Sequence, residues 1–298
     1  MRIQTFSILA GSTACNACCP FCVSKRTPNC GVQAKPSAIN WRNFRKACLL
    51  AKTSGVTTAM ITGKGEPTLF PNQITRYLEE LSKHDFPLID LQTNGIALAE
   101  SEEKRVRLSG ELDLHTPVTD EHLAVWYNLG LTTIALSVVH WKRDKNKKIY
   151  GGKHYDLENL IKKLHKIGFS VRLSCVMLGG YVDHIEEVEL MNEFARHHEV
   201  EQLTLTPVSK PAKDLEFGNN VKPLEWNATR EMKVFLDHHG TKVMELSHGA
   251  IVYDFKGQNV CLSNCLSPEP TTQELRNLIF FPDGHLRWDW QFEGAILL

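Results

Sequence analysis

The sequence predicts an α/β fold in which six βα units curve into a partial (βα)6 barrel, followed by a C-terminal β-containing extension. Short apolar runs alternate with helical patterns through the first two thirds of the 298 residues. Such alternation produces right-handed βαβ units and a parallel sheet. Glycine-rich or polar turns directly follow several of these runs. Hydrophobic residues make up 42% of the chain, which is enough for a sizeable core.

The elements of the barrel follow from these runs in order. The predicted strands are the apolar runs 3–9, 57–62, 88–93, 132–138, 170–177 and 202–207. Apolar residues repeat at helical spacing in three segments between them, which contain Trp41, Phe44, Cys48 and Ala51; Ile74, Tyr77, Leu78 and Leu81; and Leu157, Leu160, Ile161 and Leu164. Gly168 ends the third helix. Asp183 and Glu186 predict a capping box that opens a fourth helix, which continues through Phe194.

The last third of the chain has a different pattern. Residues 208–224 are polar and rich in Pro, Lys and Asn, as in a connecting loop. A helix is expected over 225–239, and short β-like runs follow at 243–246, 250–255, 278–281 and 286–290, with a turn at 282–284. We therefore expect residues 1–210 to form the barrel and residues 211–298 to cover it and close its open side.

Composition excludes several classes of protein. Basic and acidic residues balance at 34 each, so the chain lacks the global positive field of a nonspecific nucleic-acid binder. No stretch approaches eighteen uninterrupted apolar residues, so no membrane span is expected. The N-terminal residues predict the first strand rather than a signal peptide. Nine cysteines, four of them between Cys15 and Cys22, do not suggest a secreted disulfide framework and favour a reducing cytoplasm.

A cysteine motif directly follows the first predicted strand. Cys15, Cys19 and Cys22 have the spacing C-x3-C-x2-C. Three thiolates on one tight loop can hold an iron–sulfur cube by three of its irons, whereas such cubes usually have four cysteine ligands. The fourth iron is then open for chemistry. A zinc knuckle or a structural iron–sulfur site is the alternative, although zinc normally takes four ligands in paired spacings. Cys18 offers a second register with Cys22.

A second motif follows the next strand. Ile61-Thr62-Gly63-Lys64-Gly65-Glu66-Pro67-Thr68-Leu69 contains a glycine-rich turn of the G-x-G-E-P type. The cysteine loop, this turn and the Thr93-Asn94-Gly95 turn all follow strands directly, and in a barrel the carboxyl ends of the strands share one mouth. We therefore expect the three turns to lie together.

In this order and separation, the two motifs resemble those of the radical S-adenosylmethionine (radical SAM) enzymes, over most of residues 1–210. The resemblance implies a partial TIM-like barrel, a [4Fe–4S] cluster on the three cysteines and S-adenosyl-L-methionine on its fourth iron. It implies an external one-electron donor such as a flavodoxin or ferredoxin. It also places the methionine part of S-adenosylmethionine on Gly63, Gly65 and Glu66.

Three further site residues come from the resemblance. It places Thr93 at the family's third-strand T-N-G turn, Ser137 near the ribose and Arg172 against the methionine carboxylate. For each, the alternative is a partly buried strand residue that is satisfied locally. The resemblance assigns no catalytic side chain.

The pattern is most similar to the branch that contains the molybdenum-cofactor GTP cyclase, but the C-terminal cluster cysteines of that branch are missing. Cys261 and Cys265 form an incomplete pair, so we expect no auxiliary cluster. A thiol in the substrate cavity, or plain packing, is the expected role of this pair. Cys48 and Cys175 are expected to be small core residues.

One local charge cluster stands out. Residues 141–153 carry six basic side chains against a single acid, Asp144, and follow the fourth strand. This basic segment predicts a lid that attracts an anionic substrate such as a nucleotide; the alternative is a solvated surface loop. Lys210 and Lys213 are expected to face the same mouth.

The resulting hypothesis is a cytoplasmic radical SAM enzyme that cleaves S-adenosylmethionine reductively and abstracts hydrogen from a substrate, here a nucleotide or another anionic small molecule. A peptide- or protein-modifying radical SAM enzyme is the alternative within the family. A non-catalytic iron–sulfur or zinc-binding protein is the alternative from another class.

Overall fold

A computed structural model describes residues 2–25, 27–100, 118–208, 226–246, 249–263, 274–290 and 296–297. Six strands form the barrel region: β1 (Arg2–Leu9), β2 (Thr58–Thr62), β3 (Leu88–Thr93), β4 (Thr133–Val138), β5 (Ser170–Met177) and β6 (Gln202–Pro207). Their bounds agree with the predicted runs to within one residue. The α/β class with a large, mostly parallel sheet is therefore confirmed.

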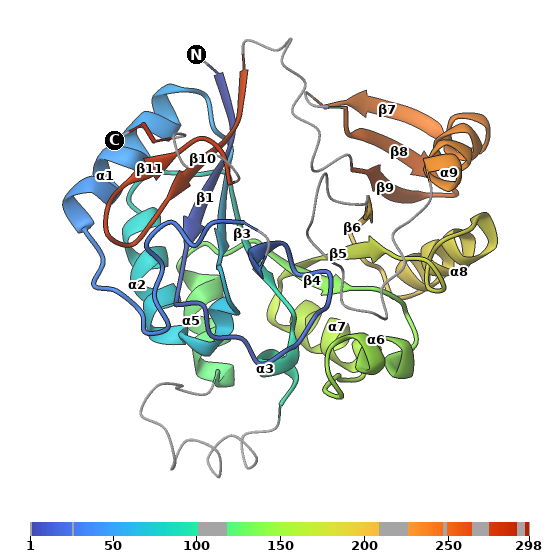
Figure 1. The fold of residues 1–298 in the computed structure, drawn as a ribbon, viewed down its shortest axis with the longest axis horizontal. Helices are drawn as coiled ribbons and strands as arrows, with labels where there is room; N and C mark the ends of the chain where they lie inside the picture. Colours follow the sequence, from blue (N-terminus) through green and yellow to red (C-terminus); the bar gives the residue numbers. More distant parts are fainter. Residues whose placement is uncertain are drawn as a thin grey trace.

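The helices alternate with these strands and cover one face of the sheet (Figure 1). They are α1 (Trp41–Thr53), α2 (Pro71–Leu81), α3 (Ile96–Ala99), α5 (Asp120–Asn128), α6 (Arg143–Ile149), α7 (Leu157–Ile167) and α8 (Ile185–His197). Short 3-10 turns lie at η1 (Val23–Lys25) and η2 (Pro67–Leu69). The three predicted apolar stripes lie on α1, α2 and α7.

The ends of two helices illustrate where local sequence signals succeed and fail. Gly168 ends α7 with a φ of 112°, the left-handed conformation that glycine adopts without strain. The capping box predicted for α8 is wrong. The N-cap residue is His184, which makes no side-chain cap hydrogen bond. Asp183 lies one residue too early, and its carboxylate instead accepts from the backbone N–H of Gly180 and contacts the His184 ring.

C-terminal strands extend both edges of this sheet. The strand order is β11-β10-β1-β2-β3-β4-β5-β6-β9-β8-β7, with β7 (Thr241–Glu245), β8 (Ile251–Phe255), β9 (Gln258–Leu262), β10 (Glu274–Phe280), β11 (Leu286–Arg287) and the helix α9 (Trp226–His239). β10 runs parallel to β1, and β9 runs parallel to β6. Figure 1 shows β10 and β11 at one end of the sheet and β7 to β9 at the other.

Three details of this C-terminal part differ from the prediction. Strand β9 was not expected, and β10 begins at Glu274 rather than at residue 278. The last strand ends at Arg287 rather than at residue 290. The turn before it is present, and the Gly284 N–H donates to the Phe281 carbonyl at 2.9 Å. Most of the expected connecting segment lies outside the described residues, and the division of the chain at residue 210 stays a prediction.

The sheet has one apolar and one more polar face. Along β5 the residues alternate between buried and half-buried. Val171, Leu173 and Cys175 point to the helix-covered core, and Arg172 and Ser174 lie on the opposite face. No helix in the described part of the chain is both long and apolar enough to cross a membrane. Most of the predicted site residues lie at or just after the carboxyl ends of the strands β1 to β4.

Candidate functional site

The cysteine loop begins where β1 ends and runs to η1. The backbone folds back on itself there, because the N–H of Cys22 donates to the carbonyl of Cys19 at 3.3 Å. The N–H of Ala17 points at the Sγ of Cys15 at 3.4 Å. Cys15 is exposed, and Cys19 and Cys22 are half-buried. The three sulfur atoms thus lie on one short loop, as the spacing predicts.

These thiols influence one another electrostatically. Burial, followed by the negative charges of Cys22 and Cys15, raises the pKa of Cys19 to about 12. Burial is also the main cause of the raised pKa of Cys15. A raised pKa disfavours the thiolate, which is the form that binds metal, so a bound cation would have to offset the cost of burying these charges.

The donor set fits a cube better than a single ion. Among the described residues, no three His, Cys, Asp or Glu side chains converge as ligands of one metal ion. Ligands of a cube bind three different irons and do not need to meet at one point. Three thiols at the C-x3-C-x2-C spacing on one loop fit a cluster in which one iron has no protein ligand.

The glycine turn packs directly against this loop. A Cβ on Gly65 would lie 1.9 Å from the carbonyl oxygen of Ala14 and 2.7 Å from that of Ser12. A Cβ on Gly63 would lie 3.0 Å from the carbonyl oxygen of Ala10. The N–H of Glu66 donates to the Ala14 carbonyl at 2.9 Å. Only glycine allows this close approach, which brings the two motifs together as expected.

Glu66 joins the second and third strand turns. Its Oε1 accepts the hydroxyl protons of Thr68 and Thr93, both at 2.6 Å, and the N–H of Thr68 at 3.0 Å. Its Oε2 accepts the N–H of Asn94 at 2.9 Å. The residue is 4% exposed. Burial raises the pKa of Glu66, and these hydrogen bonds oppose that rise. Most of its acceptor capacity is therefore used inside the protein.

Asn94 completes the connection between the turns and was not predicted as a site residue. Its amide Nδ2 donates to Oδ1 of Asn16 at 2.7 Å and lies 3.8 Å from the Sγ of Cys15. Hydrogen bonds to cluster sulfurs tune reduction potential. The T-N-G turn in the sequence could have indicated Asn94, but only Thr93 in that turn was assigned a site role from the sequence. Thr93 also holds this turn, because its Oγ1 accepts the N–H of Gly95 at 3.0 Å.

Ser137 and Arg172 lie on neighbouring strands. Ser137 is near the end of β4, and its carbonyl oxygen accepts the Tyr150 hydroxyl at 2.8 Å. The Arg172 guanidinium lies 2.9 Å from the carboxylate of Asp90, a residue that is 3% exposed. Burial raises the pKa of Asp90 and Arg172 opposes that rise. The structure thus gives Arg172 an internal partner, while its assignment to S-adenosylmethionine stays a prediction.

Tyr155 supplies the clearest sign that the site holds a further polar group. Its hydroxyl is buried and has no hydrogen-bond partner among the described residues. A Cβ on Gly95 would lie 2.3 Å from that hydroxyl, so the phenol stands against the Thr93-Asn94-Gly95 turn. A buried hydroxyl normally finds a partner. Together with the glycine cradle, this orphaned group fits a polar cofactor bound above the turns.

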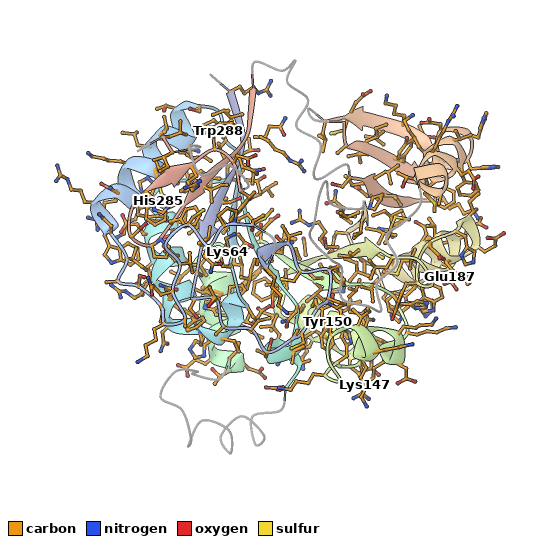
Figure 2. All side chains as sticks on the ribbon, in the orientation of Figure 1. Lys64, Lys147, Tyr150, Glu187, His285 and Trp288 are labelled. Carbon is orange, nitrogen blue, oxygen red and sulfur yellow. The ribbon has the colours of Figure 1, made fainter. Side chains whose placement is uncertain are left out.

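Lys64, the residue between the two glycines, is buried (Figure 2) and contacts the segment just after η1. Its Nζ donates to Oγ1 of Thr27 at 2.6 Å and lies 5.6 Å from the centre of the Trp290 ring. Burial lowers the pKa of Lys64. This side chain therefore ties the glycine turn to the C-terminal segment after β11.

The remaining predicted residues have varied outcomes. Cys48 and Cys175 are buried in the hydrophobic core, as expected. Cys261 is 7% exposed on β9. Cys265, Lys210 and Lys213 lie outside the described residues. All cysteines in the described part of the chain are free thiols.

The fold is similar to that of several solved structures. SuiB of Streptococcus suis bound to S-adenosylmethionine superposes with a TM-score of 0.64 at 14% identity, over 99% of this chain and 60% of SuiB. Native anSMEcpe with bound AdoMet superposes with a TM-score of 0.61 at 13% identity, over 99% of this chain and 77% of anSMEcpe. Methylornithine synthase (PylB) superposes with a TM-score of 0.53 at 14% identity, over 79% of this chain and 62% of PylB. At these identities the likeness shows the fold alone, and the chain spans only 60% of the length of SuiB.

The sequence matches a family model over more than half of its length. No curated protein matches the chain. The family model of the radical SAM superfamily, whose members use a [4Fe–4S] cluster and S-adenosylmethionine, matches residues 10–195, which include both motifs. None of the three structures above is a molybdenum-cofactor cyclase, and that branch stays a prediction. The chain belongs to the radical SAM superfamily.

Proposed function

We propose that this protein is an enzyme that cleaves S-adenosylmethionine reductively and abstracts hydrogen from a substrate. The observation that carries the proposal is the contact between the two motifs. The Gly65 turn packs on Ala14 of the cysteine loop, and Glu66 and Asn94 link that turn to the next one. A structural iron–sulfur site needs no such cradle beside its ligands.

The roles of the residues follow from their positions. Cys15, Cys19 and Cys22 would hold three irons of the cluster, and the turn at Gly63 and Gly65 would receive the methionine part of S-adenosylmethionine. The chemistry that the two cofactors supply when bound is reductive cleavage of the sulfonium to a 5′-deoxyadenosyl radical that takes hydrogen from the substrate. The protein itself orients these groups and excludes water.

The hydrogen-bonded turns give this orientation a physical basis. Glu66 accepts four hydrogen bonds within the protein, so the turns after β2 and β3 are fixed before any ligand binds. Rigid positioning lowers the entropic cost of reaching a reactive geometry. The free thiols are also consistent with a reducing compartment, for which we propose the cytoplasm.

Two substrate classes remain in the proposal. The basic residues at the start of the segment 141–153, Lys142 and Arg143, directly follow the turn after β4 and support an anionic small molecule such as a nucleotide. The likeness in fold to SuiB, one structure of which is bound to the precursor peptide SuiA, supports a peptide. The first is our preference, because its basis is charge on this chain.

The test is anaerobic reconstitution with iron and sulfide, followed by dithionite and S-adenosylmethionine. We expect 5′-deoxyadenosine from the wild type and from Cys18→Ala, and none from Cys19→Ala. Cys18 is the matched control because it lies on the same loop and is exposed. Iron binding without cleavage by the wild type would favour the non-catalytic alternative. Stimulation by peptides but not by nucleotides would favour the peptide-modifying one.

A further inference from the structure

The basic segment at residues 141–153 contains the helix α6 (Arg143–Ile149), and its basic side chains are exposed. Lys147 and Lys148 lie in the last turn of α6, and Lys153 follows shortly after; all three are exposed. No carboxylate of the described residues lies within 4.0 Å of any of these ammonium groups. Figure 2 shows Lys147 at the outer edge of the molecule, with Tyr150 closer to its middle. A cation so placed faces solvent rather than a substrate cavity.

The end of this helix is built onto the cysteine loop. The N–H of Cys18 donates to the carbonyl oxygen of Tyr150 at 3.5 Å. A Cβ on Gly151 would lie 3.1 Å from the Cβ of Cys18. The N–H of Gly152 donates to the carbonyl of Lys147 at 2.8 Å, which folds the chain back at this point. The exposed lysines therefore lie a few residues from the loop that would hold the cluster.

The helix is also held firmly in place. The side chain of Asn146 is fully buried, and its Oδ1 accepts the N–H of Val139 at 2.9 Å just after β4. The Tyr150 hydroxyl donates to the Ser137 carbonyl at 2.8 Å. These contacts attach α6 and the residue that follows it to the end of β4. A helix held in this way loses little backbone entropy when a partner binds.

We propose that the exposed face formed by Lys147, Lys148 and Lys153 is the docking surface for an acidic one-electron carrier, a flavodoxin-type protein. The inference rests on the proposed function, which requires an external electron. Electron transfer slows steeply with distance, so the carrier must approach the cysteine loop closely. Partnerless surface cations beside that loop attract an acidic protein and orient it. In the transfer, the reduced flavin loses one electron and the cluster gains it, and no covalent bond changes.

The experiment compares two double variants with the same change in net charge. Lys147→Glu/Lys148→Glu reverses the proposed surface. Lys46→Glu/Lys166→Glu reverses two exposed lysines on α1 and α7, which also lack a carboxylate partner within 4.0 Å among the described residues. Each reconstituted protein is reduced either with dithionite or with photoreduced flavodoxin, and cluster reduction is followed by absorbance. Flavodoxin binding is measured separately by titration at low and high salt.

We expect the α6 variant to be reduced by flavodoxin at least tenfold more slowly at low salt, and to bind it more weakly, while dithionite reduces it at the wild-type rate. High salt should remove most of the difference, since exposed charges are screened. Equal rates for the α6 variant and the wild type with flavodoxin would overturn the proposal, as would an equal loss in the control variant. Absence of 5′-deoxyadenosine from the wild type with dithionite would instead contradict the proposed function.

Discussion

The Glu66 carboxylate allows a quantitative test of how the site is assembled. In Glu66→Gln the amide keeps one oxygen, and we expect it to stay with the three donors that now point at Oε1. The new NH2 group then faces the backbone N–H of Asn94, which loses its acceptor. An unsatisfied buried donor costs about 1–3 kcal/mol, and a hydrogen bond to a charged group contributes about 1.5–3 kcal/mol. We expect a loss of about 3 kcal/mol in the free energy of unfolding.

The assay is urea unfolding of the metal-free protein under reducing conditions. The midpoint should fall for Glu66→Gln with no change in the slope m, because the fold itself is retained. Glu79→Gln is the control, since Glu79 is an exposed residue of α2 and surface changes of this kind usually stay within about 0.5 kcal/mol. Equal midpoints for the two variants would refute the argument that Glu66 joins the turns.

Three further predictions concern the loop, the barrel interior and the response to acid. Gly65→Ala should abolish iron incorporation, measured as iron bound per chain, because its Cβ would collide with the Ala14 carbonyl. Arg172→Met should lower stability by about 3–5 kcal/mol in urea, because it leaves the buried Asp90 carboxylate without a cation. The pKa of His140 is lowered to about 4 by burial, so the unfolded state binds its proton first. Stability should therefore fall as pH drops from about 6.5 towards 4, by at most about 3 kcal/mol, and His140→Gln should reduce that fall.

Each of these predictions has a control. Gly257 has a φ of 81° and open space where a Cβ would be added. Gly257→Ala therefore introduces conformational strain without a collision, and it should retain iron binding. Asp90→Asn combined with Arg172→Met should recover much of the lost stability, and unchanged binding of S-adenosylmethionine in that double variant would contradict the predicted role of Arg172. His238→Gln on the exposed face of α9 should leave the pH profile as it is. A pH profile for His140→Gln that matches the wild type would show that another group governs acid sensitivity.

The sequence predicted the parts of the fold that depend on local pattern. Apolar runs such as 170–177 located the strands, because buried side chains alternate along them. Strand β9 was missed because it begins with the polar residues Gln258 and Asn259. Gln258 is nevertheless buried and donates to the Val200 carbonyl at 2.7 Å. The pairing of β10 with β1 joins residues far apart in the chain, and no local signal specifies it.

The site residues divide in the same way, into those that a local sequence pattern predicts and those that only spatial contacts reveal. The cysteine spacing and the glycine turn were recognisable, because both motifs are contiguous in sequence. Asn94 and Tyr155 were missed because their importance depends on what lies beside them in space: a cysteine sulfur in one case and a glycine turn in the other. The capping prediction at Asp183 failed because a competing hydrogen bond to Gly180 holds that side chain.

The pairing of β1 with β10 has a consequence for how the chain is made. Arg2 lies opposite Glu274, and Ile8 lies opposite Phe280. A nascent chain leaves the ribosome from its N-terminus. The edge of β1 that pairs with β10 therefore stays unpaired until residues 274–280 have emerged. Until then the strand offers an open row of backbone groups to any other chain nearby. Rapid overexpression should therefore drive this protein into inclusion bodies, and slower synthesis or added chaperones should raise its yield.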